Sequence, residues 1–150
     1  MLLENKYYKI DNIENTTSGG IFHIRLIQEC DVYKGHFPGS PICPGVCNIE
    51  TIKECTMHLT NKDLYISNIQ KCRLTAVATP YECPEMDIII NIQSSDNGFT
   101  VTAKIKDMVK TYKEFKGFMT VWQSYALKYI IFSVTIELFS GVLWLYYSLV

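Results

Sequence analysis

The sequence predicts an α+β fold in which an antiparallel sheet wraps one central helix. Three observations lead to this prediction. A stretch that follows Gly45 has helical spacing, several segments after it read as strands, and Asp96-Asn97-Gly98 is a hairpin turn signal between two of them. One helix and one sheet bury each other best when the sheet curves around the helix.

Length and composition are those of one folded domain with room for an appendage. The chain has 150 residues, of which 48% are hydrophobic and 13% aromatic, enough for a core and unlike a disordered chain. Its 14 basic and 15 acidic side chains give a net charge of −1. This balance argues against a nucleic-acid-binding protein, so any charged partner has to be recognised by a local patch.

The first part of the chain is expected to contain one strand and one ordered loop. Residues 1–20 read as an irregular lead-in that ends at Gly19-Gly20. Phe22, Ile24 and Leu26 then occupy alternate positions, which predicts a strand. Residues 34–45 hold three prolines and three glycines, so this stretch is expected to be a loop.

The central helix is predicted over about residues 46–60, and Asn61 is a plausible end. Its apolar side recurs at spacings of three and four, through Val46, Ile49, Ile52, Thr56 and Leu59. Pro80 and Pro84 separate the first strand after the helix from the second. The predicted strands are 64–79, 85–94, 98–106 and 111–122.

The C-terminal segment differs from the rest, and we place a boundary between residues 1–123 and 124–150. Residues 129–150 carry one charge, Glu137, and as a helix would span about 33 Å, enough for a bilayer core. An apolar helix over about 125–149 is therefore expected, as a membrane anchor or as a helix docked on the domain or a partner; a tail foreign to the ancestral domain is a third alternative. Glu137 would cost an anchor about 3 kcal/mol. The lysines before it would keep the domain cytoplasmic, tethered to the inner face of the membrane if the segment inserts: Lys110, Lys113, Lys116 and Lys128.

The six cysteines are expected to be reduced and mostly buried. The first residues lack a signal-peptide core, and thiols stay reduced without export. Cys43 and Cys47 are four apart and could reach one metal ion, but no second pair of ligands has suitable spacing, so no metal site is expected.

Three groups suited to proton transfer converge in residues 33–50. His36 lies in a loop made rigid by prolines, Gly45 begins the helix where backbone N–H groups lack partners, and Glu50 follows His36 by 14 residues at the edge of the apolar side. A base, an acid and an N–H dipole are what proton abstraction next to a carbonyl needs. Taken singly, the histidine is more often structural and the glutamate more often serves the helix dipole.

The whole string GHFPGSPICPGVCNIE resembles the active-site segment of the FabZ-type 3-hydroxyacyl-[acyl-carrier-protein] dehydratases, GHFPxxPxxPGVxxxE. A weaker resemblance extends over about residues 20–122, where residues 69–74 look like the family's third strand. The matching positions are Gly35, His36, Phe37, Pro38, Pro41, Pro44, Gly45, Val46 and Glu50.

This resemblance implies a hot-dog fold, a homodimer or higher oligomer, and an active site that takes His36 from one subunit and Glu50 from the other. His36 would remove the C2 proton, Glu50 would protonate the leaving hydroxyl, and the Gly45 N–H would hold the charge on the carbonyl. The product would be the trans-2-enoyl thioester, in fatty-acid or related acyl-chain biosynthesis. The resemblance implies that the substrate is attached to the 4′-phosphopantetheine of acyl carrier protein and that no cofactor is required.

Further residues are nominated around this centre. The walls of the acyl tunnel are expected to include Phe37, Val46 and Ile49, for which core packing is the alternative. A basic rim that would meet the acidic carrier protein is expected to include Lys71, Arg73 and Lys34, for which a solvated surface is the alternative.

Two positions refine the resemblance. The related FabA-type enzymes, which also isomerise the double bond, carry Asp where this chain has Glu50, so dehydration alone is implied. Many FabZ-type enzymes carry Gln where this chain has Glu54, a difference that bears on turnover. Lys53 is placed to relieve repulsion between the two carboxylates, which would amount to roughly 0.2–0.5 kcal/mol if both were exposed.

Two other functions stay open. A hot-dog acyl thioesterase could use Glu50 to activate water, although it would not need the histidine loop. A non-catalytic subunit could instead pair with an active dehydratase, which Glu54 and the apolar tail would suit.

Overall fold

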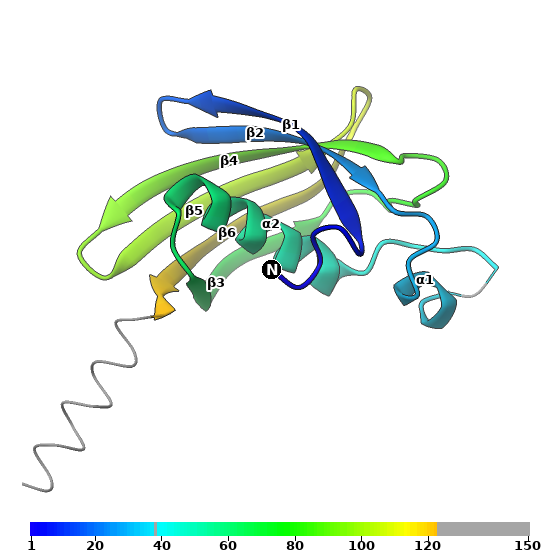
Figure 1. Cartoon of the computed structure of the whole chain (residues 1–150), viewed down its shortest axis with the longest axis horizontal. Coiled ribbons are helices and arrows are strands. Elements are labelled where there is room, and N and C mark those ends of the chain that lie inside the picture. The colour runs from blue at the N-terminus through cyan, green and yellow to red at the C-terminus, as the bar shows by residue number, and fades with distance from the viewer. Residues whose placement is uncertain (38, 123–150) are drawn as a thin grey trace, which may run out of the picture.

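A computed structural model describes residues 1–37 and 39–122, in which six strands form one antiparallel sheet that curves around the long helix α2 (Figure 1). The sheet order is β1-β2-β4-β5-β6-β3. The predicted α+β architecture, with an antiparallel sheet around a central helix, is confirmed. In chain order the elements are β1 (Tyr8–Thr16), β2 (Gly19–Leu26), α1 (Val32–Gly35), α2 (Gly45–Thr60), β3 (Leu64–Leu74), β4 (Glu85–Ser95), β5 (Gly98–Lys106) and β6 (Thr111–Val121).

The core lies between α2 and the sheet face that it covers. From the helix, Ile52 and Cys55 are fully buried. The strands contribute alternate residues, because successive side chains of a strand point to opposite faces. Burying each large apolar side chain contributes about 1.5–3 kcal/mol. The strand residues of this core include Phe22, Ile24, Leu26, Ile88, Ile90, Val101, Ile105, Phe115 and Met119.

The helix and the turns end where local chemistry predicts. Asn61 closes α2 in the left-handed conformation, with φ of 50°, which Asn tolerates better than most residues. Gly98 begins β5 with φ of 152°, and a Cβ there would lie 2.2 Å from the Met119 carbonyl oxygen, so the turn needs glycine. The predicted hairpin between β4 and β5 is therefore confirmed.

Three boundaries differ from the predictions. Residues 8–16, expected within an irregular lead-in, form β1, an edge strand with mostly exposed side chains and hence no apolar alternation. The expected loop 34–45 begins inside the short helix α1. The strand expected over 64–79 ends at Leu74, because the N–H groups of Thr75 and Ala76 both turn to the Tyr112 carbonyl.

The two edges of the sheet are β1 and β3. Along β3 only Leu64 is buried, although the strand carries apolar side chains such as Ile69 and Leu74. In the described part of the chain no strand pairs with the outer side of this 11-residue strand, and an edge of this kind is suited to pairing with another chain.

The predicted apolar helix over about 125–149 and the boundary at residue 124 lie outside the described residues and stay predictions. Within residues 1–37 and 39–122, no helix is both long and apolar enough to cross a bilayer. All six cysteines are free, and four of them are buried: Cys43, Cys47, Cys55 and Cys83.

The His23 side chain links three strands through polar contacts on the outer face of the sheet. The His23 ring in β2 lies 2.7 Å from the Asp87 carboxylate in β4 and 3.2 Å from the Glu14 carboxylate in β1. The hydrogen bond to Asp87, with help from Glu14, raises the pKa of His23 above its ordinary 6.5. The stabilisation is therefore fully present below pH 6.5 and is lost as the pH rises through the raised pKa.

We expect His23→Gln to lower the melting temperature more at pH 5.5 than at pH 8.5, because only the protonated ring forms ion pairs with both carboxylates. Thermal unfolding of the two proteins at both pH values measures this. An equal difference at the two pH values would contradict the assignment.

Candidate active site

His36 is held by the loop that joins α1 to α2. Its ring Nδ1 lies 2.9 Å from the Ile42 carbonyl oxygen, and its own N–H donates to the Val32 carbonyl at 3.1 Å. A carbonyl can only accept, so Nδ1 carries the proton, and a neutral ring then presents Nε2 as the acceptor. The half-buried imidazole is thus oriented with a free basic nitrogen.

The next residue supports this orientation at a cost in backbone energy. Phe37 takes the left-handed conformation with φ of 59°, which costs a non-glycine residue about 1–2 kcal/mol. Its ring stands edge-on to His36 with the centroids 4.8 Å apart. The Ile42 carbonyl is held in turn, because the N–H of Cys43 donates to Ala78 at 2.9 Å. Strain of this kind is typical of functional loops.

The helix start offers backbone donors without a side-chain cap. Pro44 occupies the N-cap position, and the first turn of α2 has no acidic residue. Among the described residues the N–H groups of Gly45 and Val46 find no acceptor. They therefore remain available to a negatively charged or carbonyl oxygen.

Glu50 lies in the second turn of α2 and is about three-quarters buried. Its carboxylate pairs with Lys53 at 2.7 Å. This is the pairing that the sequence suggested for Lys53. Within the described part of one chain, His36 and Glu50 make no hydrogen bond to each other, since the His36 ring is bound to Ile42 and the Glu50 carboxylate to Lys53.

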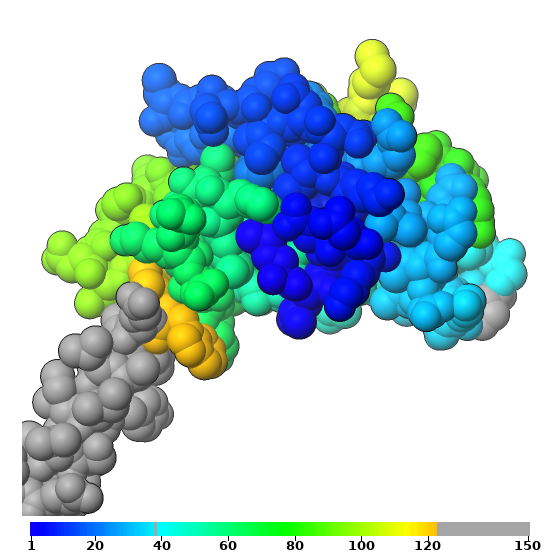
Figure 2. Space-filling view, viewed as in Figure 1, coloured from blue at the N-terminus to red at the C-terminus, as the bar shows by residue number. Residues whose placement is uncertain are grey.

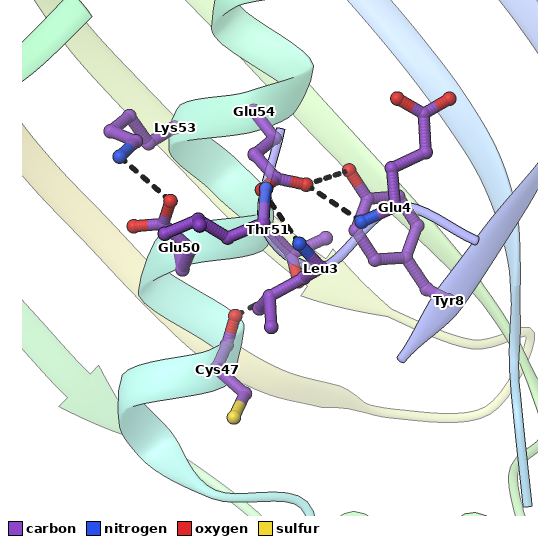
Figure 3. A network of polar contacts seen from close by, with 9 residues as sticks. Leu3, Glu4, Tyr8, Cys47, Glu50, Thr51, Lys53 and Glu54 are labelled. Atoms are coloured by element: carbon purple, nitrogen blue, oxygen red, sulfur yellow. Dashed lines mark hydrogen bonds and ion pairs between the residues drawn. The ribbon is translucent and has the colours of Figure 1, made fainter. Parts of the chain in front are cut away.

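Glu54 does not face Glu50, contrary to the concern that the two carboxylates would repel at the surface. Figure 3 shows the two side chains turned to different sides of α2. Glu54 is fully buried and accepts hydrogen bonds from the backbone N–H groups of residues 2–4 and from the hydroxyl of Tyr8, at 2.9 Å. Burial raises the pKa of Tyr8 far above its ordinary value, so this hydroxyl remains a donor.

The three nominated tunnel residues differ in exposure. Phe37 is 58% exposed and Val46 74% exposed, so neither packs in the core of one chain, while Ile49 is partly buried against the core. Exposed apolar side chains beside the histidine loop and the helix start are available to a substrate or to a partner subunit. Their role as tunnel walls remains a prediction.

The nominated basic residues are exposed but partly neutralised. Lys71 pairs with Glu114 at 2.6 Å, and Lys34 pairs with Asp31 at 2.6 Å. Arg73 lies opposite Glu114 in the register of β3 and β6. A further lysine, Lys104, is opposite Glu114 on the other side, so three cations surround one carboxylate and the patch keeps a positive excess.

Sequence reasoning missed one charged residue next to this site. Lys113, which was counted with the basic flank of the C-terminal segment, is buried, and its Nζ donates to the Gly45 carbonyl at 2.7 Å. Period-two spacing could have found it, because Lys113 alternates with Phe115, Gly117 and Met119 on the inward face of β6.

Comparison with known proteins finds similar sequences among dehydratases. The family model described as "ApeI-like: ApeI dehydratase" matches residues 12–113. A 3-hydroxyacyl-[acyl-carrier-protein] dehydratase FabZ of Ruegeria sp. (strain TM1040) is 30% identical over 96 residues, 58% of this chain and 58% of that protein. The FabZ of Caulobacter vibrioides (strain NA1000 / CB15N) is 28% identical over 93 residues, 55% of this chain and 58% of that protein. The chain thus spans somewhat more than half the length of these relatives.

Solved structures agree on the fold. The dehydratase heterocomplex ApeI:P from Xenorhabdus doucetiae superposes with a TM-score of 0.63 at 19% identity, over 74% of this chain and 96% of that one. An uncharacterised protein from Erwinia carotovora gives a TM-score of 0.55 at 14% identity, over 75% and 92% of the two chains.

We expect Glu54→Ala to destabilise the domain by about 3 kcal/mol or more, because three backbone donors and the Tyr8 hydroxyl would lose their charged acceptor inside the protein. Urea unfolding measures the change. Glu14→Ala, which removes an exposed carboxylate, is the control and should cost less than about 1 kcal/mol. Equal effects of the two substitutions would contradict the structural role of Glu54.

Proposed function

The chain belongs to the ApeI-like dehydratase family, and we propose that it removes water from 3-hydroxyacyl thioesters carried by acyl carrier protein. The observation that carries this proposal is the His36–Ile42 hydrogen bond, which leaves Nε2 available as a base in the loop that leads into α2. Family membership supplies the class of reaction, and the loop supplies a group that can begin it.

The reaction needs two proton transfers and one place for negative charge. His36 Nε2 removes a proton from C2, and the electron pair moves toward the thioester carbonyl, whose oxygen is held by the Gly45 N–H at the positive end of the helix. The pair then forms the C2–C3 double bond while the C3 hydroxyl leaves as water with a proton from Glu50. His36 then releases its proton to solvent and Glu50 takes one up, so both groups return to their starting states. Every step is a proton transfer, and no oxidant or reductant is needed.

The family resemblance implies a site shared by two chains, and it is consistent with this that no hydrogen bond joins His36 to Glu50 within the described part of one chain. Pairing β3 with β3 of a second copy would cover the exposed apolar side chains of this edge and bring the two halves together. We therefore propose a homodimer as the catalytic unit.

A second candidate is a subunit that completes a related dehydratase. The solved ApeI:P structure is a dehydratase heterocomplex, and the same β3 edge could accept a different hot-dog chain. In that case His36 or Glu50 of this chain would serve a site whose other half comes from the partner. A hot-dog thioesterase is the third alternative, and its product would be a free acid.

We propose that the substrate enters beside Phe37, Val46 and Ile49. The carrier protein is acidic and would meet the surface around Glu114, where Lys71, Lys104 and Arg73 leave an excess of positive charge.

His36→Ala should lower the rate of enoyl-thioester formation by about 10²–10⁴-fold, because the general base is removed. Mass spectrometry of the products from 3-hydroxyacyl carrier protein measures this, and Glu50→Gln is expected to act similarly. His58→Ala, which changes an exposed histidine far along α2, is the control.

The product identity decides among the alternatives. Free acid instead of enoyl thioester would show a thioesterase. Unchanged activity of His36→Ala, or activity found only after a second chain is added, would show a supporting subunit.

Replacing Lys71 and Arg73 together by Ala should raise KM for the carrier-bound substrate about three- to tenfold and leave kinetics with a pantetheine thioester unchanged, because only the carrier uses the basic rim. Measuring both substrates at low and high salt checks this. An equal loss with both substrates would place the two residues in the chemical site or the fold instead.

A further inference from the structure

We propose that Lys113 is a positioning residue of the active site, whose ammonium strengthens the ability of the first turn of α2 to hold negative charge on the thioester oxygen. The inference rests on the proposed dehydration. It concerns a residue of β6 that acts through the Gly45 carbonyl, to which its Nζ donates at 2.7 Å.

The first argument is burial without an ionic partner. Lys113 is only 3% exposed, and among the described residues its ammonium forms no ion pair and no hydrogen bond other than the one to Gly45. An ammonium removed from water costs several kcal/mol, and one neutral carbonyl offsets only part of this cost. A buried charge that does not stabilise the fold is expected where the charge has a function.

The second argument is the place where the charge lies. The start of a helix carries a partial positive charge, and cations are normally found at the other end. Here a lysine contacts the first turn, no side chain caps it, and no acidic residue occurs within it. The positive end of the helix dipole and the Lys113 ammonium lie together, and the first turn contains no acidic side chain. The local potential therefore suits an oxygen that becomes negative during the reaction.

A third observation points to the same turn. Asn48, one turn beyond Gly45 on the same side of α2, is 5% exposed, and its side chain forms no hydrogen bond within residues 1–37 and 39–122. The amide atoms of Asn48 keep some contact with solvent, because the Tyr7 hydroxyl is the only fully buried polar side-chain atom without a partner in the described part of the chain. The start of α2 is thus flanked by two polar side chains with few protein partners, Asn48 in the helix and Lys113 in β6.

The route from Lys113 to the substrate runs through one peptide group. The Gly45 carbonyl shares its amide with the N–H of Val46, which lies at an exposed residue and has no acceptor among the described residues. Hydrogen bonds in a chain polarise one another, so donation to this carbonyl makes the Val46 N–H a stronger donor. The N–H groups of Gly45 and Val46 would then face the substrate oxygen together, with the ammonium behind them.

Lys113→Met tests this, because Met has a similar length and no charge. We expect kcat with a 3-hydroxyacyl pantetheine thioester to fall about 10- to 100-fold, less than the 10²–10³-fold typical for loss of a direct oxyanion donor, with KM changed less than about threefold. Lys113→Arg, which keeps the charge, should retain more activity than Lys113→Met. Lys110→Met replaces an exposed lysine of the same hairpin and is the matched control.

Thermal stability distinguishes the positioning role of Lys113 from a purely structural role in anchoring the helix. Replacing a buried charge by an apolar side chain of similar volume is often neutral or stabilising, so Lys113→Met should melt at the same or a higher temperature while it loses activity. A lower melting temperature with unchanged kcat would show a structural lysine and overturn the proposal.

A readout independent of turnover uses acetoacetyl-pantetheine, whose enolate is followed by its ultraviolet absorbance as the pH is varied. On the wild-type protein the midpoint for enolate formation should lie below that of the free thioester, and Lys113→Met should raise it by about one pH unit, a tenfold loss of preference for the anion. Equal midpoints for the two proteins, or no binding of the analogue, would overturn the inference. A wild-type protein that forms no enoyl product but shows the lowered midpoint would refute the proposed function and leave the role of Lys113 supported.

Discussion

The hydrogen bonds of the buried Glu54 carboxylate fix the relation between the N-terminus and α2, and the rest of the domain is arranged around that helix. The sheet covers one side of α2, while residues 2–4 and Tyr8 cover another, as the dark blue segment against the helix in Figure 2 shows. A charged acceptor with four donors is well satisfied in a low-dielectric interior. Many FabZ-type enzymes carry Gln at this position. In this chain the Glu54 carboxylate has a structural role there.

The candidate site lies toward the N-terminal end of the same helix, where groups of the described chain lack partners. Among residues 1–37 and 39–122, the helix start has no side-chain cap, one ring nitrogen of His36 has no partner, and no strand pairs with the outer edge of β3. Each of these would be a weakness in a self-sufficient monomer. Together they support the proposed dimer, in which a second chain that pairs with β3 would cover the edge and complete the pair of proton-transfer groups.

The sequence predicted the helix, most strands and the β4–β5 turn, because these depend on local spacing and on Asn and Gly at particular positions. It did not predict β1, whose exposed side chains lack alternation and whose pairing with β2 provides its order. It nominated His36, Gly45 and Glu50 as site residues through a long motif, and their roles stay predictions. It could not assign Glu54, because the donors to its carboxylate lie about 50 residues away in the sequence, and no local pattern encodes such a contact.

Comparing Glu54 with Lys113 shows how a buried charge can be assigned a role. Glu54 belongs to α2 and Lys113 contacts it. Counted over the described residues, Glu54 has four hydrogen-bond partners and Lys113 has one. Removing the well-satisfied charge leaves donors without an acceptor, whereas removing the poorly satisfied one relieves a desolvation cost. The first charge therefore acts on folding. The Lys113 charge carries a desolvation cost that disfavours folding. It contacts the turn of α2 where the reaction would develop negative charge.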